Sequence, residues 1–398
     1  MSSSATGRSN SRAKRRSNNS TGGGSGVSGD VTNTQQEVHF PSLPIGEVQR
    51  SRSSRRSRGR SVASGEASSE EKSLMVGVET PLGLDTKVVH RNDYDIYYVL
   101  DAILWCTVAT FCLYKCVEEN NYLYLLVVGF SESKLGLIAH ESCHNCCPRF
   151  LSLLYDCALG SRLQWIQKHN KQHHLFTNTK DDPDIDASPI LRIHPDQPLY
   201  WFHKWQWLYQ YILFCIIPIS LRLNGVLYLL LNGGLVEILL HFILSAPATY
   251  LYIIWPVQKY GFIGLKFFFI SNAVLGLIYG CLFSVSHIND LVEFDPEGSI
   301  VDRQMKATAD WSSGSVICNY LTGGLNHQVI HHLFPHLPSY ALPTLAQELL
   351  LASDSSDNFT GQGGALINNK DKYKVLRGGF LGALISNAVY LHKMGKQQ

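Results

Sequence analysis

Eight histidines fall into three tight clusters in this chain of 398 residues, and each lies within five positions of another. Neutral imidazole is the commonest metal ligand in proteins. A single tetrahedral zinc takes only three or four protein ligands, so eight histidines exceed the needs of one such ion. Iron, as two ions, is the simplest interpretation. The clusters are His140 and His144; His169, His173 and His174; and His327, His331 and His332.

The spacing within the clusters favours two metal ions side by side. Residues four apart on a helix share a face, which fits His140 and His144. Adjacent residues on a helix point about 100° apart. The pairs His173–His174 and His331–His332 are therefore poorly placed for one ion and suited to two neighbouring ions.

His287 is a further candidate ligand, because it ends an apolar stretch at about the depth of the three clusters. The remaining histidines stand alone, and we interpret them as polar residues satisfied near the lipid headgroups. In residues 96–398 they are His194, His203, His241, His336 and His392.

Ligation by imidazole suits zinc, copper or iron. Hydrolytic zinc would leave at least five of the clustered histidines unexplained. A di-iron centre uses them and supplies oxygen chemistry that side chains cannot perform. Beside a membrane, the plausible target is an unactivated C–H bond of a fatty chain.

Four apolar stretches approach the roughly 20 residues that a helix needs to cross a bilayer. They cover residues 96–114, 122–139, 233–255 and 262–285. Two spans precede the first two clusters and two more precede the third, so an even count returns all three clusters to one side. The aromatic segment 201–221 is expected to lie at the interface, with Pro218 kinking or ending it. These features predict an all-α integral membrane fold with four transmembrane helices and a cytosolic or stromal helical cap that holds the site.

The N-terminal region has a different composition. Residues 1–73 are rich in Ser, Gly and Arg, and we expect residues 1–95 to form a disordered tail, with residues 96–398 as the membrane domain. Its Arg clusters fit contact with anionic lipid on the cytosolic side, a plastid transit peptide or, less simply, nucleic acid. The formal charge of +2 decides nothing alone. The ten cysteines are expected to be reduced thiols.

The clusters, in this order and pattern, resemble the three histidine boxes of the membrane fatty-acid desaturases, over roughly residues 95–395. The most specific piece is the segment 323–335, GGLNHQVIHHLFP. It resembles the front-end subgroup, in which Gln takes the place of a box histidine, here Gln328. Cyanobacterial-type Δ6 acyl-lipid desaturases are especially similar. The second cluster, with Thr177 and Asn178 after it, is also similar to that subgroup.

The resemblance implies a set of iron ligands, with Gln328 at or just behind the metal and His327 as a second-choice candidate. The remaining ligands are His140, His144, His169, His173, His174, His287, His331 and His332. It also implies two non-haem irons, O2 as co-substrate, electrons delivered singly by a small redox protein, and formation of a cis double bond. No His-Pro-Gly-Gly motif of a fused cytochrome b5 domain occurs in residues 1–95. The expected donor is therefore a separate cytochrome b5 in the endoplasmic reticulum or a ferredoxin in a plastid.

Around this centre we expect an apolar acyl tunnel with its mouth near Trp165, Trp207 or Trp311, and carboxylates of the run 181–186 bonded to ligating imidazoles. Three alternatives stay open. One is a sphingolipid or sterol-type desaturase or hydroxylase with the same boxes. Another is an intramembrane zinc protease, since residues 140–144 read H-E-x-x-H with Glu141 as general base. The third is a metal transporter or sensor, although transporters place polar ligands inside their spans.

Overall fold

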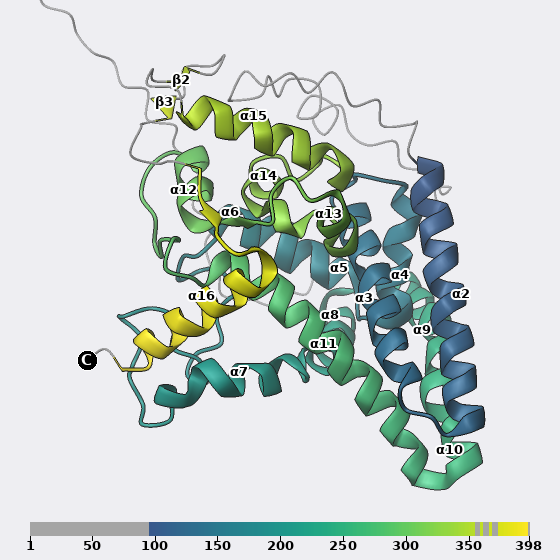
Figure 1. Ribbon diagram of the computed structural model, residues 1–398. Coiled ribbons are helices and arrows are strands. Elements are labelled where there is room, and N and C mark those ends of the chain that lie inside the picture. Colours follow the sequence, from purple (N-terminus) through teal and green to yellow (C-terminus); the bar gives the residue numbers. More distant parts are fainter. Residues whose placement is uncertain (1–94, 355–358, 361–365, 368–372, 397–398) are drawn as a thin grey trace, which may run out of the picture. The chain divides into compact units, whose positions relative to one another are not determined.

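The structure is a computed structural model that describes residues 95–354, 359–360, 366–367 and 373–396. The chain divides into two units, residues 1–66 and 67–398, and all described residues belong to the second. The predicted N-terminal tail lies outside them, apart from its last residue. Within the described residues the fold is mostly helical, as predicted (Figure 1).

Four helical segments coincide with the predicted spans (Figure 1). They are α2 (Asp95–Glu119), α3 (Tyr124–Cys143), α9 (Leu235–Thr249) with η6 (Tyr250–Ile254), and α11 (Leu265–His287). Two stretches are long and apolar enough to cross a bilayer, residues 95–119 and the 53 residues 235–287. α3 has the length but carries Glu132, Lys134 and Glu141, so it is less apolar than the other two.

The stretch 235–287 is a chain that turns back on itself. At about 1.5 Å per residue, 53 helical residues would run for roughly 80 Å, far more than the roughly 30 Å of hydrocarbon in a bilayer. The helix α10 (Trp255–Tyr260) ends at Gly261, whose φ of 64° reverses the chain, and η7 (Gly261–Gly264) leads into α11. The α11 helix then packs against η6.

The turn at Gly261 lies at the same end as the turn between α2 and α3. Lys259 forms an ion pair with Glu118 at 2.8 Å, and the Tyr260 hydroxyl donates to the Val117 carbonyl at 2.6 Å. α10 lies at the opposite end of the helices from α12 (Ile300–Ala307) and α14 (Gln328–Leu333) (Figure 1).

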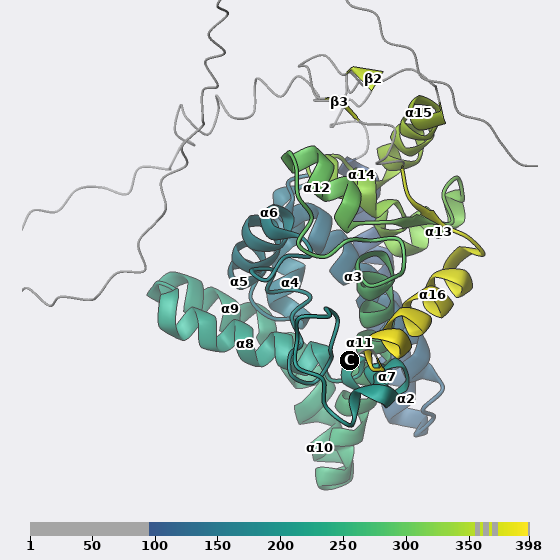
Figure 2. The same ribbon diagram turned by 90° about the vertical axis from the view of Figure 1, so that its left-hand side faces the viewer.

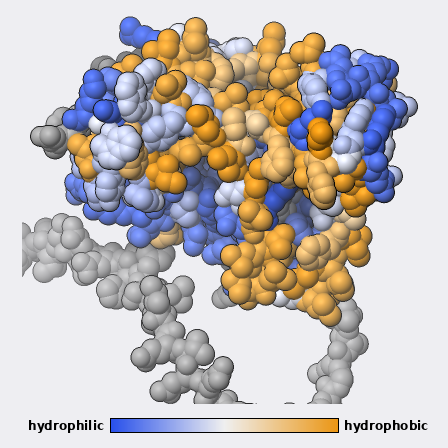
Figure 3. All heavy atoms as spheres, turned by 90° about the horizontal axis from the view of Figure 1, so that it is seen from below, coloured by the Kyte–Doolittle hydropathy of each residue, from blue (hydrophilic) through white to orange (hydrophobic). Residues whose placement is uncertain are grey.

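The aromatic segment forms α7 (Gln206–Phe214), preceded by η5 (His203–Trp205), and α8 (Ile217–Asn232). The two are bent by 64° at the break, and Pro218 stands in the first turn of α8, as predicted. α8 and α9 lie side by side (Figure 2). Seen from the α10 end, apolar side chains form a broad band across the surface, with hydrophilic groups at its edges (Figure 3).

The region between α3 and α7 forms short helices, and further helices, which we call the cap, follow α11. The former are η3 (Arg149–Ser152), α4 (Leu153–Ala158), α5 (Arg162–Trp165), η4 (Ile166–His173) and α6 (His174–Phe176). The latter comprises α12, α13 (Val316–Thr322), η8 (Leu325–His327), α14, η9 (Ser339–Ala341), α15 (Leu342–Asp354) and α16 (Gly379–Met394).

Two small strand pairs occur that the sequence did not predict. β1 (Asp310–Trp311) runs parallel to β4 (Val375–Leu376), with Asp310 opposite Val375. β2 (Phe359–Thr360) pairs antiparallel with β3 (Leu366–Ile367). The β1–β4 pair ties the C-terminal segment to the cap, and α16 then packs on α7 and α11.

Candidate metal centre

The three histidine clusters, far apart in sequence, meet in one buried place. His140, His144, His169 and His331 can each offer a ligand atom such that all of these atoms lie within 4.8 Å of one another. We call them the four-histidine group. Each of the four is at most 7% exposed. The first, second and third clusters thus all contribute to a single group.

A second group lies beside the first. His173, His287 and His332 also place their ligand atoms within 4.8 Å of one another, and we call them the three-histidine group. Their ring centres are 4.8–4.9 Å apart. His287, predicted from its position at the end of an apolar stretch, lies at the last residue of α11.

His174 lies between the two groups. Its ring stacks on His332 of the three-histidine group at 4.3 Å and lies 4.7 Å from His144 of the four-histidine group. The Gln328 amide nitrogen lies 3.0 Å from His287 Nε2. His327 belongs to neither group, and its Nδ1 lies 3.4 Å from the carboxylate of Asp310.

The local helices explain how adjacent histidines reach different groups. His331 and His332 are successive residues of α14, and their rings stand 86° apart, one in each group. His169 and His173 lie on η4, a π-helical segment, with rings stacked at 5.0 Å. Short π-helical segments occur frequently at functional sites. Here η4 supplies one ring to each group.

Neighbouring side chains fix which ring nitrogen faces the groups. His169 Nδ1 lies 2.6 Å from Asp184, and His173 Nδ1 lies 2.9 Å from both carboxylate oxygens of Asp182. A carboxylate can only accept, so each Nδ1 carries the hydrogen and each Nε2 keeps its lone pair. The expectation that the acidic run supports the imidazoles is confirmed for these two residues.

Gln304 does the same for the third cluster. Its amide nitrogen donates to the carbonyl of His174 at 2.8 Å, which leaves its oxygen to accept from His332 Nδ1 at 2.9 Å. The Thr177 hydroxyl also lies 3.2 Å from that nitrogen. His332 Nε2 is thereby left free to bind a metal.

Burial keeps most of these rings neutral. It lowers the pKa of His331 to about 3, helped by repulsion from His169 and His173. Burial also lowers the pKa of His174 well below its ordinary value, with repulsion from His332 and His144. Burial opposes charge on His173 too, but the Asp182 carboxylate outweighs it and raises that pKa. Neutral imidazole is the form that ligates metal.

An apolar cavity of about 390 Å³ reaches the histidines. Trp165, one of the three tryptophans proposed for the tunnel mouth, lines it and stacks on His169 at 4.5 Å, so it lies beside the histidines. The other two tryptophans proposed for the mouth lie elsewhere. Trp311 is 1% exposed and donates to Ser286, and Trp207 packs with the ring of His392.

Comparisons with known proteins agree with this geometry. A family model described as fatty acid desaturase matches residues 121–357, more than half of the chain. The chain belongs to the fatty acid desaturase family. The matched region of this desaturase family member includes all three histidine clusters and His287.

Several curated relatives are similar to the chain. It is 27% identical to a Delta(5) fatty acid desaturase A of Dictyostelium discoideum, over 72% of this chain and 66% of the relative. It is 30% identical to a probable Delta(5) fatty acid desaturase C of the same organism, over 55% and 56%. It is 27% identical to an sn-1 linoleoyl-lipid 6-desaturase of Arthrospira platensis, over 66% and 80%. The chain thus spans about two thirds or less of the length of the two Dictyostelium relatives.

The side chains fit the pair of metal ions that this family uses. Several buried ring nitrogens have no hydrogen-bond partner, and a buried polar atom without one is rare and costly. A metal ion in each group would satisfy one nitrogen of each ligating ring. The unpartnered atoms near the groups are His140 Nδ1, His144 Nε2, both nitrogens of His174, His287 Nδ1, His331 Nε2 and His332 Nε2. Both nitrogens of His327, which belongs to neither group, also lack a hydrogen-bond partner.

The zinc-protease interpretation fits less well. Its general base would be Glu141, but this carboxylate accepts hydrogen bonds from the Tyr98 hydroxyl and the Ser339 backbone N–H. Glu141 is in neither histidine group. The cysteines of the described part of the chain form no disulfides with one another.

Sequence reasoning missed several supporting residues. Asp310 is fully buried and accepts from the Val329 N–H at 2.7 Å, at the start of α14. Asn178 donates to the backbone carbonyl of His287 at 2.9 Å. An Asp or Asn in a loop is common, so only the three-dimensional contacts distinguish them. The isolated histidines have polar partners outside the two groups: for example, His241 lies against the Asp156 carboxylate and His203 against the Pro189 carbonyl.

Proposed function

We propose that the protein is a membrane-bound, O2-dependent fatty acyl desaturase of the front-end type, which inserts a cis double bond into a long acyl chain. One observation carries the proposal: both groups of buried imidazoles contribute rings to the lining of one largely apolar cavity. An acyl chain fits such a cavity by its shape and apolarity. The names of the relatives support the same reaction class.

The proposed cofactor is a pair of non-haem iron ions, one held by each histidine group, with His174 between them. When bound, such a pair supplies the one-electron and O2 chemistry that side chains lack. Gln328 is proposed to act through His287, which its amide contacts. His327 remains the second-choice candidate ligand, and its contact with Asp310 favours a role in positioning the third cluster.

In this reaction two adjacent methylenes each lose a hydrogen. The two hydrogens supply two electrons and two protons, and an external donor supplies two more electrons, taken up with two further protons, so that O2 is reduced to two waters. The protein's own part is positional. Trp165 and Phe283 confine the chain beside the ligating rings, while Asp182, Asp184 and Gln304 hold those rings in one tautomer.

We further propose four membrane crossings, by α2, α3, α9–η6 and α11, with the histidines on the cytosolic or stromal side. The substrate would be an acyl lipid or acyl-coenzyme A in the endoplasmic reticulum or a plastid membrane. The donor would be a separate cytochrome b5 or ferredoxin. The alternative within the superfamily is a sphingolipid desaturase or hydroxylase, which would act on a different lipid with the same metal centre.

Expression in a yeast that lacks polyunsaturated lipids tests the reaction. Candidate fatty acids are fed with a competent donor present, and double-bond positions in the products are read by mass spectrometry. A new cis double bond near the carboxyl end supports the proposal. A hydroxylated product or a modified sphingolipid would establish the alternative, and an unchanged lipid profile would contradict both.

Metal content tests the ligand assignment separately. His331→Ala should abolish turnover and lower bound iron, while His327→Ala should keep both irons. His392→Ala, far from either group, is the matched control and should change neither property. Equal loss of iron from His327→Ala and His331→Ala would make His327 a ligand, and a single zinc in the purified protein would refute the centre.

A further inference from the structure

A second cavity contains charged groups that the proposed reaction does not use. It measures about 320 Å³ and lies between α3, α4, α8, α9 and η6. Glu132, Asp156, Arg222 and His241 line it, together with Tyr252. Charged side chains within membrane helices are costly and mark functional sites.

Two of these charges lack a countercharge in contact. Glu132 is 3% exposed, and its Oε2 has no hydrogen-bond partner. The Arg222 guanidinium donates to the Asn272 side chain and the Pro218 carbonyl, both uncharged, and within the described residues it makes no ion pair. Asp156, by contrast, is paired with Arg162 and His241. Glu132 also accepts a hydrogen bond from Tyr252 and is attracted to Arg222 beyond ion-pair contact. The cavity therefore offers one carboxylate oxygen without a hydrogen-bond partner and one guanidinium whose hydrogen-bond partners are uncharged.

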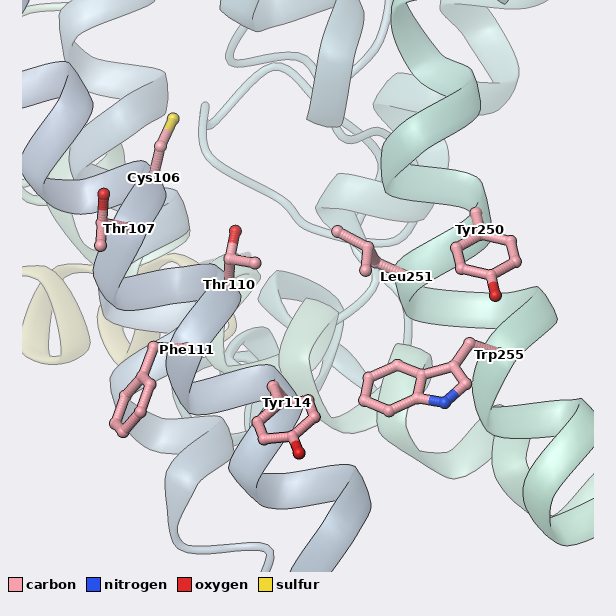
Figure 4. Close-up of a pocket in the computed structure, with 8 residues that line it drawn as sticks. All are labelled: Cys106, Thr107, Thr110, Phe111, Tyr114, Tyr250, Leu251 and Trp255. Atoms are coloured by element: carbon pink, nitrogen blue, oxygen red, sulfur yellow. The ribbon is translucent and has the colours of Figure 1, made fainter.

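An apolar groove adjoins this cavity. It measures about 690 Å³ and lies between α2 and the segment η6–α10 (Figure 4). Along η6, Tyr250 and Leu251 line the groove while Thr249 and Tyr252 line the cavity. Cys106 lies at the groove's upper end in Figure 4.

The groove extends from the cavity away from the histidines. Tyr114 and Trp255 close its far part with rings stacked at 5.9 Å (Figure 4). Tyr114 is nearer than Cys106 to the α2–α3 turn, which lies at the end opposite the cap. A polar pocket nearer the histidine side and an apolar groove beyond it match an amphiphile, with its head toward the interface and its tail in the bilayer.

We propose that the cavity and groove bind one phospholipid with a primary ammonium head, as a site separate from the histidine centre. The phosphate would lie at Arg222, since guanidinium groups bind phosphate in a forked geometry. The ammonium would lie at Glu132 and donate to the unpartnered oxygen. A quaternary ammonium has no hydrogen to donate, so the site should prefer ethanolamine to choline heads.

The test uses the full chain, purified and reconstituted in nanodiscs of mixed phosphatidylethanolamine, phosphatidylcholine and phosphatidylglycerol with identical acyl chains. Lipid retained after mild detergent extraction is measured by native mass spectrometry. The expected result is at least tenfold enrichment of phosphatidylethanolamine over both others. Equal retention of the three, or preference for phosphatidylglycerol, would overturn the proposal.

Two variants localise the site. Glu132→Gln removes the anion, and Ala248→Phe fills the cavity without changing any charge; each should abolish the enrichment. Glu237→Gln makes the same charge change on α9 outside the cavity lining and should preserve it. If Glu132→Gln does not fold, Ala248→Phe decides. Enrichment that persists in a folded Ala248→Phe protein overturns the proposal, whatever the desaturase assay shows.

Discussion

Single residues around the centre decide whether each imidazole presents a lone pair or a hydrogen. The carboxylates of Asp182 and Asp184 and the amide of Gln304 each take the Nδ1 hydrogen of one ring. Burial would raise the pKa of Asp184, but the hydrogen bond from His169 and the nearby Lys168 ammonium lower it well below its ordinary value. Asp184 is therefore a carboxylate at neutral pH.

Asp184→Asn should weaken iron binding and turnover by about 10- to 100-fold, the usual effect of losing a bond that orients a ligating histidine. The amide keeps the shape of the side chain but can present its NH2 group to His169 and favour the wrong tautomer. Iron per chain and turnover are measured together. Asp181→Asn, an exposed change in the same loop, should leave both unaltered, and an equal loss there would indicate a general effect of the loop.

Among the elements, η4 and α14 show what the sequence could predict. The spacing of His331 and His332 correctly assigned adjacent rings to separate groups, because that follows from helical geometry. The π-helical form of η4 was not predictable, since one extra residue per turn depends on packing around Trp165 and His169. The sequence also could not show that His327 turns toward Asp310, because that carboxylate is 17 residues away in the chain.

Asp310 should hold the start of α14 in place. It is buried, accepts from the Val329 N–H, and also accepts from the Tyr373 hydroxyl of the C-terminal segment. Hydrogen bonds to charged groups contribute roughly 1.5–3 kcal/mol each. Asp310→Ala should thus lower the free energy of unfolding by about 3 kcal/mol or more. Chemical denaturation of both proteins in detergent measures this difference. Tyr114→Phe, at an exposed ring, should change it little; an equally stable Asp310→Ala would refute this role.

Ser284 on α11 should control passage of the acyl chain to the histidines. It lines the cavity less than one helical turn before His287. Ser284→Phe should fill the space beside the centre, so turnover of long chains should fall while bound iron stays the same. Leu277→Phe makes a similar addition at a position 40% exposed and should retain normal turnover. Unchanged products from Ser284→Phe would show that the substrate does not use this cavity.

At the scale of the whole membrane domain, composition predicted most of the helices but not their connections. The four apolar stretches all became helices, and Pro218 marked the bend between α7 and α8. The reversal at Gly261 and the β1–β4 pair depend on backbone conformation and on residues far apart in the chain, so composition could not locate them. Convergence of the clusters was expected because an even number of spans would put them on one side of the membrane, and that number stays a prediction.

Four membrane crossings predict that Gly261 and Gly314 lie on opposite sides of the bilayer. Gly261 and Gly314 both have positive φ, and neither has a neighbouring atom where a side chain would begin. Gly261 lies at the α10 end, tied to the α2–α3 turn, whereas Gly314 lies in the cap. A long loop with an N-glycosylation acceptor, inserted after Gly261, should be glycosylated in yeast microsomes, because that end would face the lumen.

The same loop inserted after Gly314 should remain unmodified, because the cap carries the third cluster and would face the cytosol. Each insertion is checked for turnover, so that a misfolded protein is not scored. Glycosylation after Gly314 alone would invert the orientation and place the centre in the lumen. Modification at both positions would mean that the two ends lie on one side, which four crossings by α2, α3, α9–η6 and α11 do not allow.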